Sequence, residues 1–348
     1  MPYRVICLQA DHTIVTTPLK IAILDDYQDA ARRLACYPLL DGHEVKVFQS
    51  STRGLGQLAI RLAPFDALVL IRERTAFPAA LLAKLPNLKL ISQTGKVSGH
   101  IDVAAATARG IAIAEGVGSP VAPAELTWTL IMAASRKIVP YATNLKEGLW
   151  QTASTNPVLN GVGRVLHGRT LGLWSYGKIG KLVAGYARAF GMRVVVWGSD
   201  ASRQAAIADG VEAAPSREAL FEMADVLSLH LRLADTTRGI VTASDLARMK
   251  PDALFVNTSR AELVADGALE SALKKGHPGM AALDVFTSEP LAPDAPLLRI
   301  PTVLATPHIG YVEQDSYELY FRAAFENIVQ FAQGTPTNIL NPEALGKR

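Results

Sequence analysis

Short apolar runs alternate with longer amphipathic stretches over the first part of the chain. The runs predict β-strands at Ile21–Leu24, Glu44–Phe48, Ala67–Ile71, Leu88–Ser92 and Ile111–Ala114. The stretches between them predict helices, among them Gln28–Leu34, Pro78–Leu85 and Val103–Arg109. Strands that alternate with helices are typical of parallel βαβ units joined by right-handed crossovers. We therefore expect one small doubly wound domain of the flavodoxin-like kind from Lys20 to about Gly116.

The same alternation returns in the second half of the chain. It predicts strands at Thr170–Trp174, Arg193–Trp197, Val226–Leu231, Ala253–Val256, Met280–Leu283 and Thr302–Ala305. Six strands with intervening helices match a Rossmann dinucleotide-binding sheet in number and spacing. Between the two alternating regions, the pattern predicts a long helix from about Ala122 to Trp150, interrupted at Pro140. A polar loop or arm is then expected over Thr152–Gly168.

A helical stripe ends the alternating part of the chain. Its apolar positions recur at intervals of three and four and stop before Gly334; they are Tyr317, Tyr320, Phe321, Ala324, Phe325, Ile328 and Phe331. We expect this last helix to pack back on the first domain, which would make that domain discontinuous. The predicted architecture is α/β with two doubly wound parallel sheets. Residues 1–120 and 312–348 would form the substrate domain, and residues 121–311 the Rossmann domain.

Composition narrows the class of protein. The chain has 348 residues and a formal net charge of +3 without a run of Lys and Arg, so it gives no reason to expect nucleic acid or an anionic membrane as a partner. No apolar stretch predicts a transmembrane helix, and the first nineteen residues lack the features of a signal peptide. The only two cysteines, Cys7 and Cys36, favour a reducing cytoplasm. We expect no metal site. The role of the first nineteen residues, an unusual extension, stays open.

A glycine-containing loop follows the first strand of the predicted Rossmann domain. From Leu171 to Gly180 the chain reads LGLWSYGKIG, with Gly177 and Gly180 at the second and third glycine positions of a dinucleotide-binding loop and Ser175 at the first. N–H groups and the dipole at the start of the next helix favour a pyrophosphate. The expected contacts come from Tyr176, Gly177, Lys178, Ile179 and Gly180. An ordinary glycine-rich turn would have a similar pattern, and the effect of Ser175 stays open.

The next strand carries the signal for the adenosine ribose of the cofactor. A Rossmann strand at this place normally ends in an acidic residue that binds the ribose hydroxyls. The residues that follow Trp197 are, in order, Gly198, Ser199, Asp200, Ala201, Ser202 and Arg203. Asp200 can still reach a ribose, which favours NAD. Ser199, Ser202 and Arg203, with no acid at Gly198, equally suit the phosphate of NADP. The sequence leaves NAD and NADP open.

Three segments in the last third of the chain each place one side chain suited to ketone chemistry just after a predicted strand. They are Asn257–Arg260, Asp284–Pro290 and Thr306–Gly310, and they carry Arg260, Glu289 and His308 respectively. In an open parallel sheet, ligands bind beyond the carboxyl ends of the strands. Taken singly, these residues also suit a salt bridge, a turn and a packed histidine. Together they predict an enzyme active site.

The order of these motifs resembles the D-isomer-specific 2-hydroxyacid dehydrogenase family, over most of the chain from Lys20 onward. The resemblance rests on the loop around Gly177, the Asn-Thr-Ser-Arg strand end, the Asp-Val-Phe-Thr-Ser-Glu-Pro segment and the Thr-Pro-His-Ile-Gly segment. It implies two doubly wound domains with the active site in the cleft between them, usually in a homodimer. It also implies reversible reduction of a small 2-keto acid by NADH or NADPH.

By this resemblance, Arg260, Glu289 and His308 occupy the catalytic positions, and the chemistry of the side chains agrees. Hydride transfer to a 2-keto carbon builds negative charge on the carbonyl oxygen, and a histidine, with an ordinary pKa of about 6.5, can supply the proton. Glu289 can hydrogen-bond the other ring nitrogen, and Arg260 can grip the substrate carboxylate with its planar fork. Asp284 matches the residue that orients the nicotinamide amide. The remaining expected cofactor contacts are Ser199, Asp200, Thr258, Ser259, Arg260, His308 and Gly310.

The first domain is expected to contribute the rest of the substrate site. Gln93–Asp102 resembles the family loop whose backbone amides hold the substrate carboxylate, with Lys96 as an added cation and Val97 where the family usually has glycine. Tyr311, at a position that is often small in the family, is expected to narrow the pocket or to hydrogen-bond the substrate. The expected substrate contacts are therefore Lys96, Val97, Arg260, His308 and Tyr311.

Three functions stay open at this point. The preferred one is a D-2-hydroxyacid dehydrogenase that reduces 2-keto acids of the glyoxylate or hydroxypyruvate class. The second is phosphoglycerate dehydrogenase. The third is a nucleotide-sensing binding protein similar to the C-terminal-binding corepressors, because a fold alone does not determine function.

Overall fold

The computed structural model describes residues 18–52 and 54–347. Cys7 and nearly all of the expected N-terminal extension lie outside these residues. The chain divides into two compact units. The first unit consists of the residues up to Gly118 together with those from Gln314 onward, and the second is Ser119–Glu313.

The first unit is built on a five-stranded parallel sheet with the order β2-β1-β3-β4-β5. Its strands are β1 (Lys20–Ile23), β2 (Glu44–Val47), β3 (Ala67–Leu70), β4 (Leu90–Gln93) and β5 (Ala112–Ala114). This order is that of flavodoxin-like folds, so the predicted fold class is confirmed. The two strands β3 and β4 are buried at every position and therefore covered on both faces. Such strands read as continuous apolar runs, which is why the pattern predicted them.

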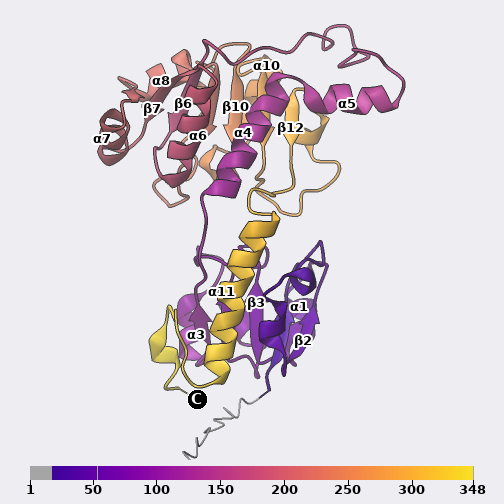
Figure 1. The fold of residues 1–348 in the computed structure, drawn as a ribbon, viewed down its shortest axis with the longest axis vertical. Helices are drawn as coiled ribbons and strands as arrows, with labels where there is room; N and C mark the ends of the chain where they lie inside the picture. The colour runs from indigo at the N-terminus through magenta and orange to yellow at the C-terminus, as the bar shows by residue number, and fades with distance from the viewer. Residues whose placement is uncertain (1–17, 53, 348) are drawn as a thin grey trace, which may run out of the picture. The chain divides into compact units, whose positions relative to one another are not determined.

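Short helices and the last helix of the chain cover this sheet. They are η1 (Ala31–Arg33), η2 (Tyr37–Leu40), α1 (Leu55–Leu62), α2 (Ala79–Leu82), α3 (Val103–Ala108), α11 (Gln314–Ala332) and η5 (Pro342–Ala344). As expected, α11 packs on the sheet of the first unit (Figure 1), where the Ser92 hydroxyl donates a 2.8 Å hydrogen bond to the carbonyl of Ala324. The helix predicted over Gln28–Leu34 is only the single turn η1. Asp29 just before it has a φ of +49°, which a continuous helix does not allow.

The second unit is built on a seven-stranded parallel sheet with the order β12-β11-β10-β9-β6-β7-β8. Its strands are β6 (Thr170–Trp174), β7 (Arg193–Trp197), β8 (Glu212–Ala213), β9 (Val226–Leu229), β10 (Leu254–Asn257), β11 (Met280–Leu283) and β12 (Val303–Ala305). This is the order of a Rossmann sheet extended by one strand, with the direction of winding reversed between β6 and β9. The pattern missed β8, because two residues without a buried side chain leave no periodic signal.

Helices cover both faces of the second sheet. They are α4 (Val121–Ser135), α5 (Ile138–Lys146), α6 (Lys178–Ala189), α7 (Asp200–Ala208), α8 (Arg217–Met223), α9 (Ala243–Leu246), η3 (Ala261–Leu263), α10 (Ala268–Lys275) and η4 (Pro296–Arg299). Helices α4 and α6 lie side by side against the sheet (Figure 1). None of the helices in the described part of the chain combines the length and apolar character needed to cross a bilayer.

The long helix predicted between the two alternating regions is in fact the pair α4 and α5. The break falls at Lys137, whose φ of +51° is left-handed, so the predicted interruption at Pro140 is wrong. Pro140 lies in the first turn of α5, where a missing N–H costs no intrahelical hydrogen bond. The helix ends at Lys146, and the segment up to Gly168 contains no helix or strand, as the polar composition predicted.

Candidate active site

The turn after β10 is held by the side chain of Asn257. Its carboxamide oxygen accepts a hydrogen bond from the N–H of Ser259 at 3.0 Å, and its amide nitrogen donates to the carbonyl of Arg260 at 2.9 Å. The hydroxyl of Ser259 donates to the carbonyl of Leu229 at the end of the neighbouring strand β9. These bonds determine the backbone from which the Arg260 side chain leaves the sheet.

Thr258 is tied to helix α4 by a residue that the motifs did not indicate. The hydroxyl of Thr127 lies 2.7 Å from the hydroxyl of Thr258 and donates to the carbonyl of Pro123 within its own helix. Thr127 is fully buried. No local signal in the sequence distinguishes it, because its partner lies 131 residues further along the chain.

His308 and Glu289 form a close pair at the carboxyl end of the same sheet. Nδ1 of His308 lies 2.6 Å from Oε2 of Glu289, so the ring N–H donates to the carboxylate. The other carboxylate oxygen accepts the N–H of Phe286 at 2.9 Å. His308 itself has a φ of +52°, a backbone conformation that costs a non-glycine residue free energy and that the surrounding contacts must impose. The pair orients the imidazole and leaves Nε2 as the nitrogen that can serve a substrate.

Arg260 belongs to the same cluster of charges. Partial burial raises the pKa of the Glu289 carboxyl, but the hydrogen bond and charge of His308, the N–H of Phe286 and the charge of Arg260 outweigh it and bring that pKa below its ordinary value. The ring of Tyr311 meets the ring of His308 edge to face, with centroids 5.6 Å apart. The three residues predicted to be catalytic and Tyr311 therefore lie in one part of the second unit.

Asp284 holds the turn that carries His308. Its Oδ1 accepts the hydroxyl of Thr306 at 2.6 Å and the N–H of Ile309 at 2.9 Å, and its Oδ2 accepts the N–H of Gly310 at 2.9 Å. The carboxyl is fully buried, and burial raises its pKa against these hydrogen bonds and the charge of His308, which lower it. A Cβ at Gly310 would lie 3.2 Å from Oδ2, so glycine allows this close approach.

The loop between β6 and α6 has the shape that a pyrophosphate needs. A Cβ at Gly180 would lie 2.7 Å from the carbonyl oxygen of Ser175, so only glycine lets the helix pack this closely. A Cβ at Gly177 would meet nothing within 4 Å, which leaves the backbone at the start of α6 open to a ligand. The first-turn N–H groups of a 12-residue helix point into this space. These residues fit a dinucleotide.

At the end of β7, the predicted ribose contacts are partly engaged with one another. The guanidinium of Arg203 lies over the ring of Trp197, 4.5 Å from its centroid, donates to the carbonyl of Gly198 and pairs with the carboxylate of Asp200. The side chain of Asp200 is 89% exposed. Ser199 caps α7 by accepting the N–H of Ser202. An acid and a base are thus both present at the ribose end of the loop.

The comparison with known protein families decides the identity of this sheet. The family model described as "D-isomer specific 2-hydroxyacid dehydrogenase, NAD binding domain" matches residues 128–310. The chain belongs to this family. It is therefore an oxidoreductase that acts on a CH–OH group with NAD or NADP, and the predicted family, enzyme class and cofactor are confirmed.

Individual relatives of the dehydrogenase agree with this assignment. Glyoxylate reductase of Aeropyrum pernix is 38% identical over 77% of this chain and 81% of its own length. D-3-phosphoglycerate dehydrogenase of Methanocaldococcus jannaschii is 33% identical over 94% of this chain and 62% of its own length. Among solved structures, phosphoglycerate oxidoreductase from Vibrio cholerae O395 superposes with a TM-score of 0.88 at 56% identity, covering 91% of this chain and 99% of that one.

The loop of the first unit that was expected to bind substrate is engaged within the dehydrogenase chain. The N–H of Val97 donates to Oε1 of Glu115 at 2.9 Å, and the ammonium of Lys96 lies 2.8 Å from Oε2. Burial raises the pKa of Glu115, but Lys96 and Val97 bring it below its ordinary value. The side chain of Lys96 is 73% exposed. Sequence reasoning missed Glu115, whose role follows only from the pairing of β4 with β5.

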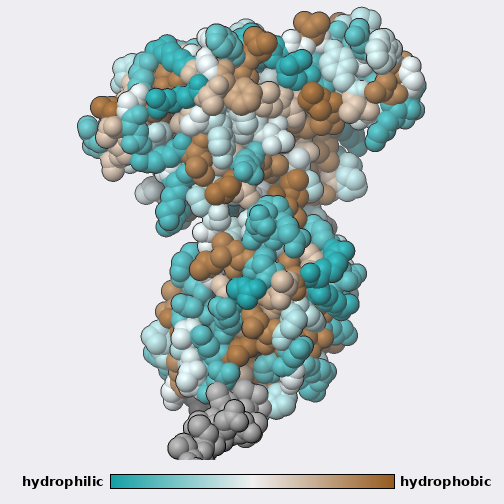
Figure 2. All heavy atoms as spheres, in the orientation of Figure 1, coloured by the Kyte–Doolittle hydropathy of each residue, from teal (hydrophilic) through white to brown (hydrophobic). Residues whose placement is uncertain are grey.

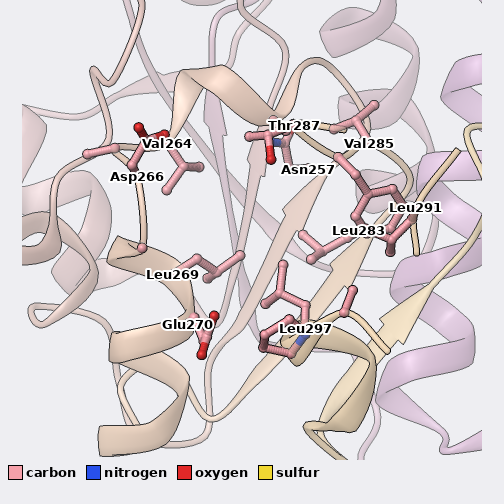
Figure 3. Close-up of a pocket in the computed structure, with 16 residues that line it drawn as sticks. Asn257, Val264, Asp266, Leu269, Glu270, Leu283, Val285, Thr287, Leu291 and Leu297 are labelled. Carbon is pink, nitrogen blue, oxygen red and sulfur yellow. The ribbon is translucent and has the colours of Figure 1, made fainter. Parts of the chain in front are cut away.

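A separate pocket of about 480 Å³ is lined in part by residues of the segments Asn257–Arg260 and Asp284–Pro290 (Figure 3). Figure 3 shows a lining that is mostly aliphatic, with Val264, Leu269, Leu283, Val285 and Leu297 among the labelled residues. Asn257, which holds the Arg260 turn, also lines it. Arg260, Glu289 and His308 do not, so we do not assign this pocket to the reaction.

The three hydrogen bonds to Asp284 generate a prediction about stability. Asp284→Ala leaves two backbone N–H groups without acceptors, and the unfolding free energy should fall by about 2–4 kcal/mol in urea denaturation. Asp284→Asn keeps one oxygen and should lose less. Equal stability of the wild-type and Asp284→Ala proteins would show that this carboxylate does not hold the His308 turn.

Proposed function

We propose that the chain is a 2-keto acid reductase in which His308 donates the proton, Glu289 orients the His308 ring, and Arg260 binds the substrate carboxylate. The observation that carries the proposal is the 2.6 Å contact between Glu289 and His308 with the charge of Arg260 beside it. A nicotinamide cofactor, when bound, supplies the hydride in reduction and accepts it in the reverse reaction.

The proton chemistry follows from the pair. Negative charge develops on the carbonyl oxygen as the 2-keto carbon is reduced, and a positioned imidazolium can neutralise it. The Glu289 carboxylate, with a pKa below its ordinary value, stays ionised near neutrality and accepts the hydrogen bond of the ring N–H. In the reverse direction the neutral ring takes the proton from the hydroxyl group.

Arg260 is the group proposed to bind the substrate carboxylate. Its guanidinium has a permanent charge and a planar fork that matches a carboxylate. The side-chain amide of Asn257 donates a hydrogen bond to the carbonyl of Arg260. This bond holds the Arg260 backbone and so supports a defined direction for the Arg260 side chain. Asp284, Thr258, Ser259 and Gly310 would then hold the nicotinamide end of the cofactor, and Tyr176–Gly180 its pyrophosphate.

The proposed substrate is a small anionic 2-keto acid of the glyoxylate or hydroxypyruvate class. Lys96, Val97 and Tyr311 are the further residues we assign to it. The Glu115 carboxylate already compensates part of the charge of Lys96, which suits a substrate with one carboxylate. Phosphoglycerate is the second candidate, because relatives that match over most of the chain bear that activity in their names.

The reaction class can be tested by following absorbance at 340 nm with glyoxylate, hydroxypyruvate, pyruvate, phenylpyruvate and 3-phosphohydroxypyruvate, each with NADH and with NADPH. We expect oxidation of the cofactor with at least one acid. His308→Ala should lower kcat by roughly 10²–10⁴-fold without its proton donor, while NADH binding measured by fluorescence stays intact. A fully active His308→Ala protein would remove His308 from this role, and a preference for the phosphorylated acid would favour the second candidate.

Arg260→Lys tests the carboxylate contact separately. The variant keeps the charge but loses the fork, so KM for the keto acid should rise about tenfold or more while the Kd for NADH changes little. Arg248→Lys is the matched control, because Arg248 pairs with Glu222 on the surface. Unchanged kinetics in Arg260→Lys would mean that another group holds the carboxylate.

We also propose that the enzyme is a homodimer and that α5 with the following arm, residues 147–165, contacts the partner. Figure 1 shows this segment extending away from the sheet of its unit. Helix α5 has no buried residue. Exposed apolar side chains occur on α5 and along the arm, among polar ones (Figure 2). The apolar residues are Ile138, Val139, Leu145, Trp150, Val158, Val162 and Val165. A row of this kind favours a protein partner.

The double variant Ile138→Asp/Trp150→Asp should therefore be a monomer in size-exclusion chromatography with light scattering, where the wild type is a dimer. Ile138 is 54% and Trp150 77% exposed, so within one chain the charges cost little. Ile60→Asp, at an 80% exposed position on α1, is the control and should stay dimeric. A monomeric wild type, or a dimeric double variant, would contradict the proposed interface.

A reducing cytoplasmic location also belongs to the proposal. Cys36, the cysteine in the described part of the chain, is buried and unpaired.

A further inference from the structure

Two unusual residues, one in the dinucleotide loop and one after the next strand, are far apart in the sequence, but both lie close to the hydroxyl of Ser202 in the structure. Ser175 stands where a dinucleotide-binding loop has its first glycine, and Gly198 stands where the next strand has its acid. The hydroxyl of Ser202, in the first turn of α7, lies between them. It accepts the N–H of Tyr176 at 2.6 Å.

Ser175 adopts a conformation that a side chain disfavours. Its φ is +85°, a region that glycine enters freely and other residues enter only when their surroundings impose it. A serine at this position therefore requires contacts that hold the loop. A glycine would not require them to the same degree.

Three contacts hold the peptide groups on either side of Ser175. Its own N–H donates to the carbonyl of Trp197 at 2.7 Å. Its carbonyl oxygen packs against Gly180, where a Cβ would lie only 2.7 Å away. The next N–H, that of Tyr176, donates to Ser202. Of these three, only the contact with Ser202 is made by a side chain.

Gly198 provides the room for this side chain. A Cβ at Gly198 would lie 3.1 Å from Oγ of Ser202 and 3.5 Å from Cα of Ser175. Any larger residue there, including the usual acid, would press on the hydroxyl that holds the loop. The missing acid at Gly198 and the serine at position 175 are thus two parts of one arrangement.

We propose that Ser202 is a positioning residue for the cofactor: its hydroxyl holds the Ser175–Tyr176 peptide so that the start of α6 is presented to the pyrophosphate. The proposal rests on dinucleotide binding at this loop. Ser202 acts on the loop and leaves the ribose to Asp200 and Arg203, so its removal affects NADH and NADPH alike.

The test is a double-mutant cycle read by fluorescence titration of NADH and of NADPH, without turnover. Ser202→Ala should raise both Kd values about tenfold and raise KM for the cofactor, with KM for the keto acid unchanged. Ser175→Gly should bind at least as tightly as the wild type. In the Ser175→Gly background, Ser202→Ala should cost threefold or less, since glycine adopts the positive φ without help.

Ser216→Ala is the control, because the Ser216 hydroxyl also accepts a backbone N–H, that of Ala219, but does so as the N-cap of α8 and outside the dinucleotide loop. It should leave both Kd values unchanged. An effect of Ser202→Ala below twofold, or of equal size in both backgrounds, would overturn the proposal. Absence of NADH binding by the wild type would instead contradict the function proposed for the loop.

Hydrogen exchange of the wild type provides a readout that does not depend on a folded variant. The amide of Tyr176 should be protected without cofactor, since Ser202 accepts its hydrogen bond, whereas the amides of Lys178 and Ile179 should become protected only with cofactor. Rapid exchange at Tyr176 in the cofactor-free enzyme would contradict the proposal.

Discussion

The buried carboxylate of Asp284 ties the end of β11 to the turn after β12, and the geometry of the active site depends on it. It accepts three hydrogen bonds from Thr306, Ile309 and Gly310, the residues that surround His308. A buried carboxylate that organises two loops is costly to desolvate, and its raised pKa reflects this cost. The three hydrogen bonds that the carboxylate accepts offset this cost.

Strand register brings the Arg260 segment to the same edge of the sheet. β10 and β11 pair in parallel with Asn257 opposite Leu283, so the chain leaves both strands at the same level. Arg260 and Asp284 follow from there: the carbonyl of Arg260 accepts a hydrogen bond from the Asn257 side chain, and the N–H of Asp284 donates to the carbonyl of Asn257. Helix α4 adds the contact between Thr127 and Thr258 from the covered face. The candidate catalytic side chains thus lie on short loops at the end of a sheet, and the short loops limit the movement of each side chain.

The cofactor end of the sheet obeys a different constraint. Here the backbone itself is the proposed binding surface, so the structure must hold peptide groups in place. Gly180 does this by allowing close packing, and Ser202 by accepting an N–H. Ser175 in place of the first glycine and Gly198 in place of the acid can therefore compensate one another. The ribose end presents an ion pair between Asp200 and Arg203, so neither charge alone expresses a preference between NAD and NADP.

The sequence by itself determined the two parallel sheets, the family and the residues at the strand ends, because buried parallel strands appear as apolar runs and their carboxyl ends carry the ligand contacts. It located His308, Glu289 and Arg260 for the same reason. It did not determine the contacts between Thr127 and Thr258, between Ser202 and Tyr176, or between Glu115 and Val97. Strand β8 and the helix break at Lys137 were also beyond the pattern. Only the tertiary structure decided the three contacts, because each depends on which distant residues the fold brings within hydrogen-bond distance.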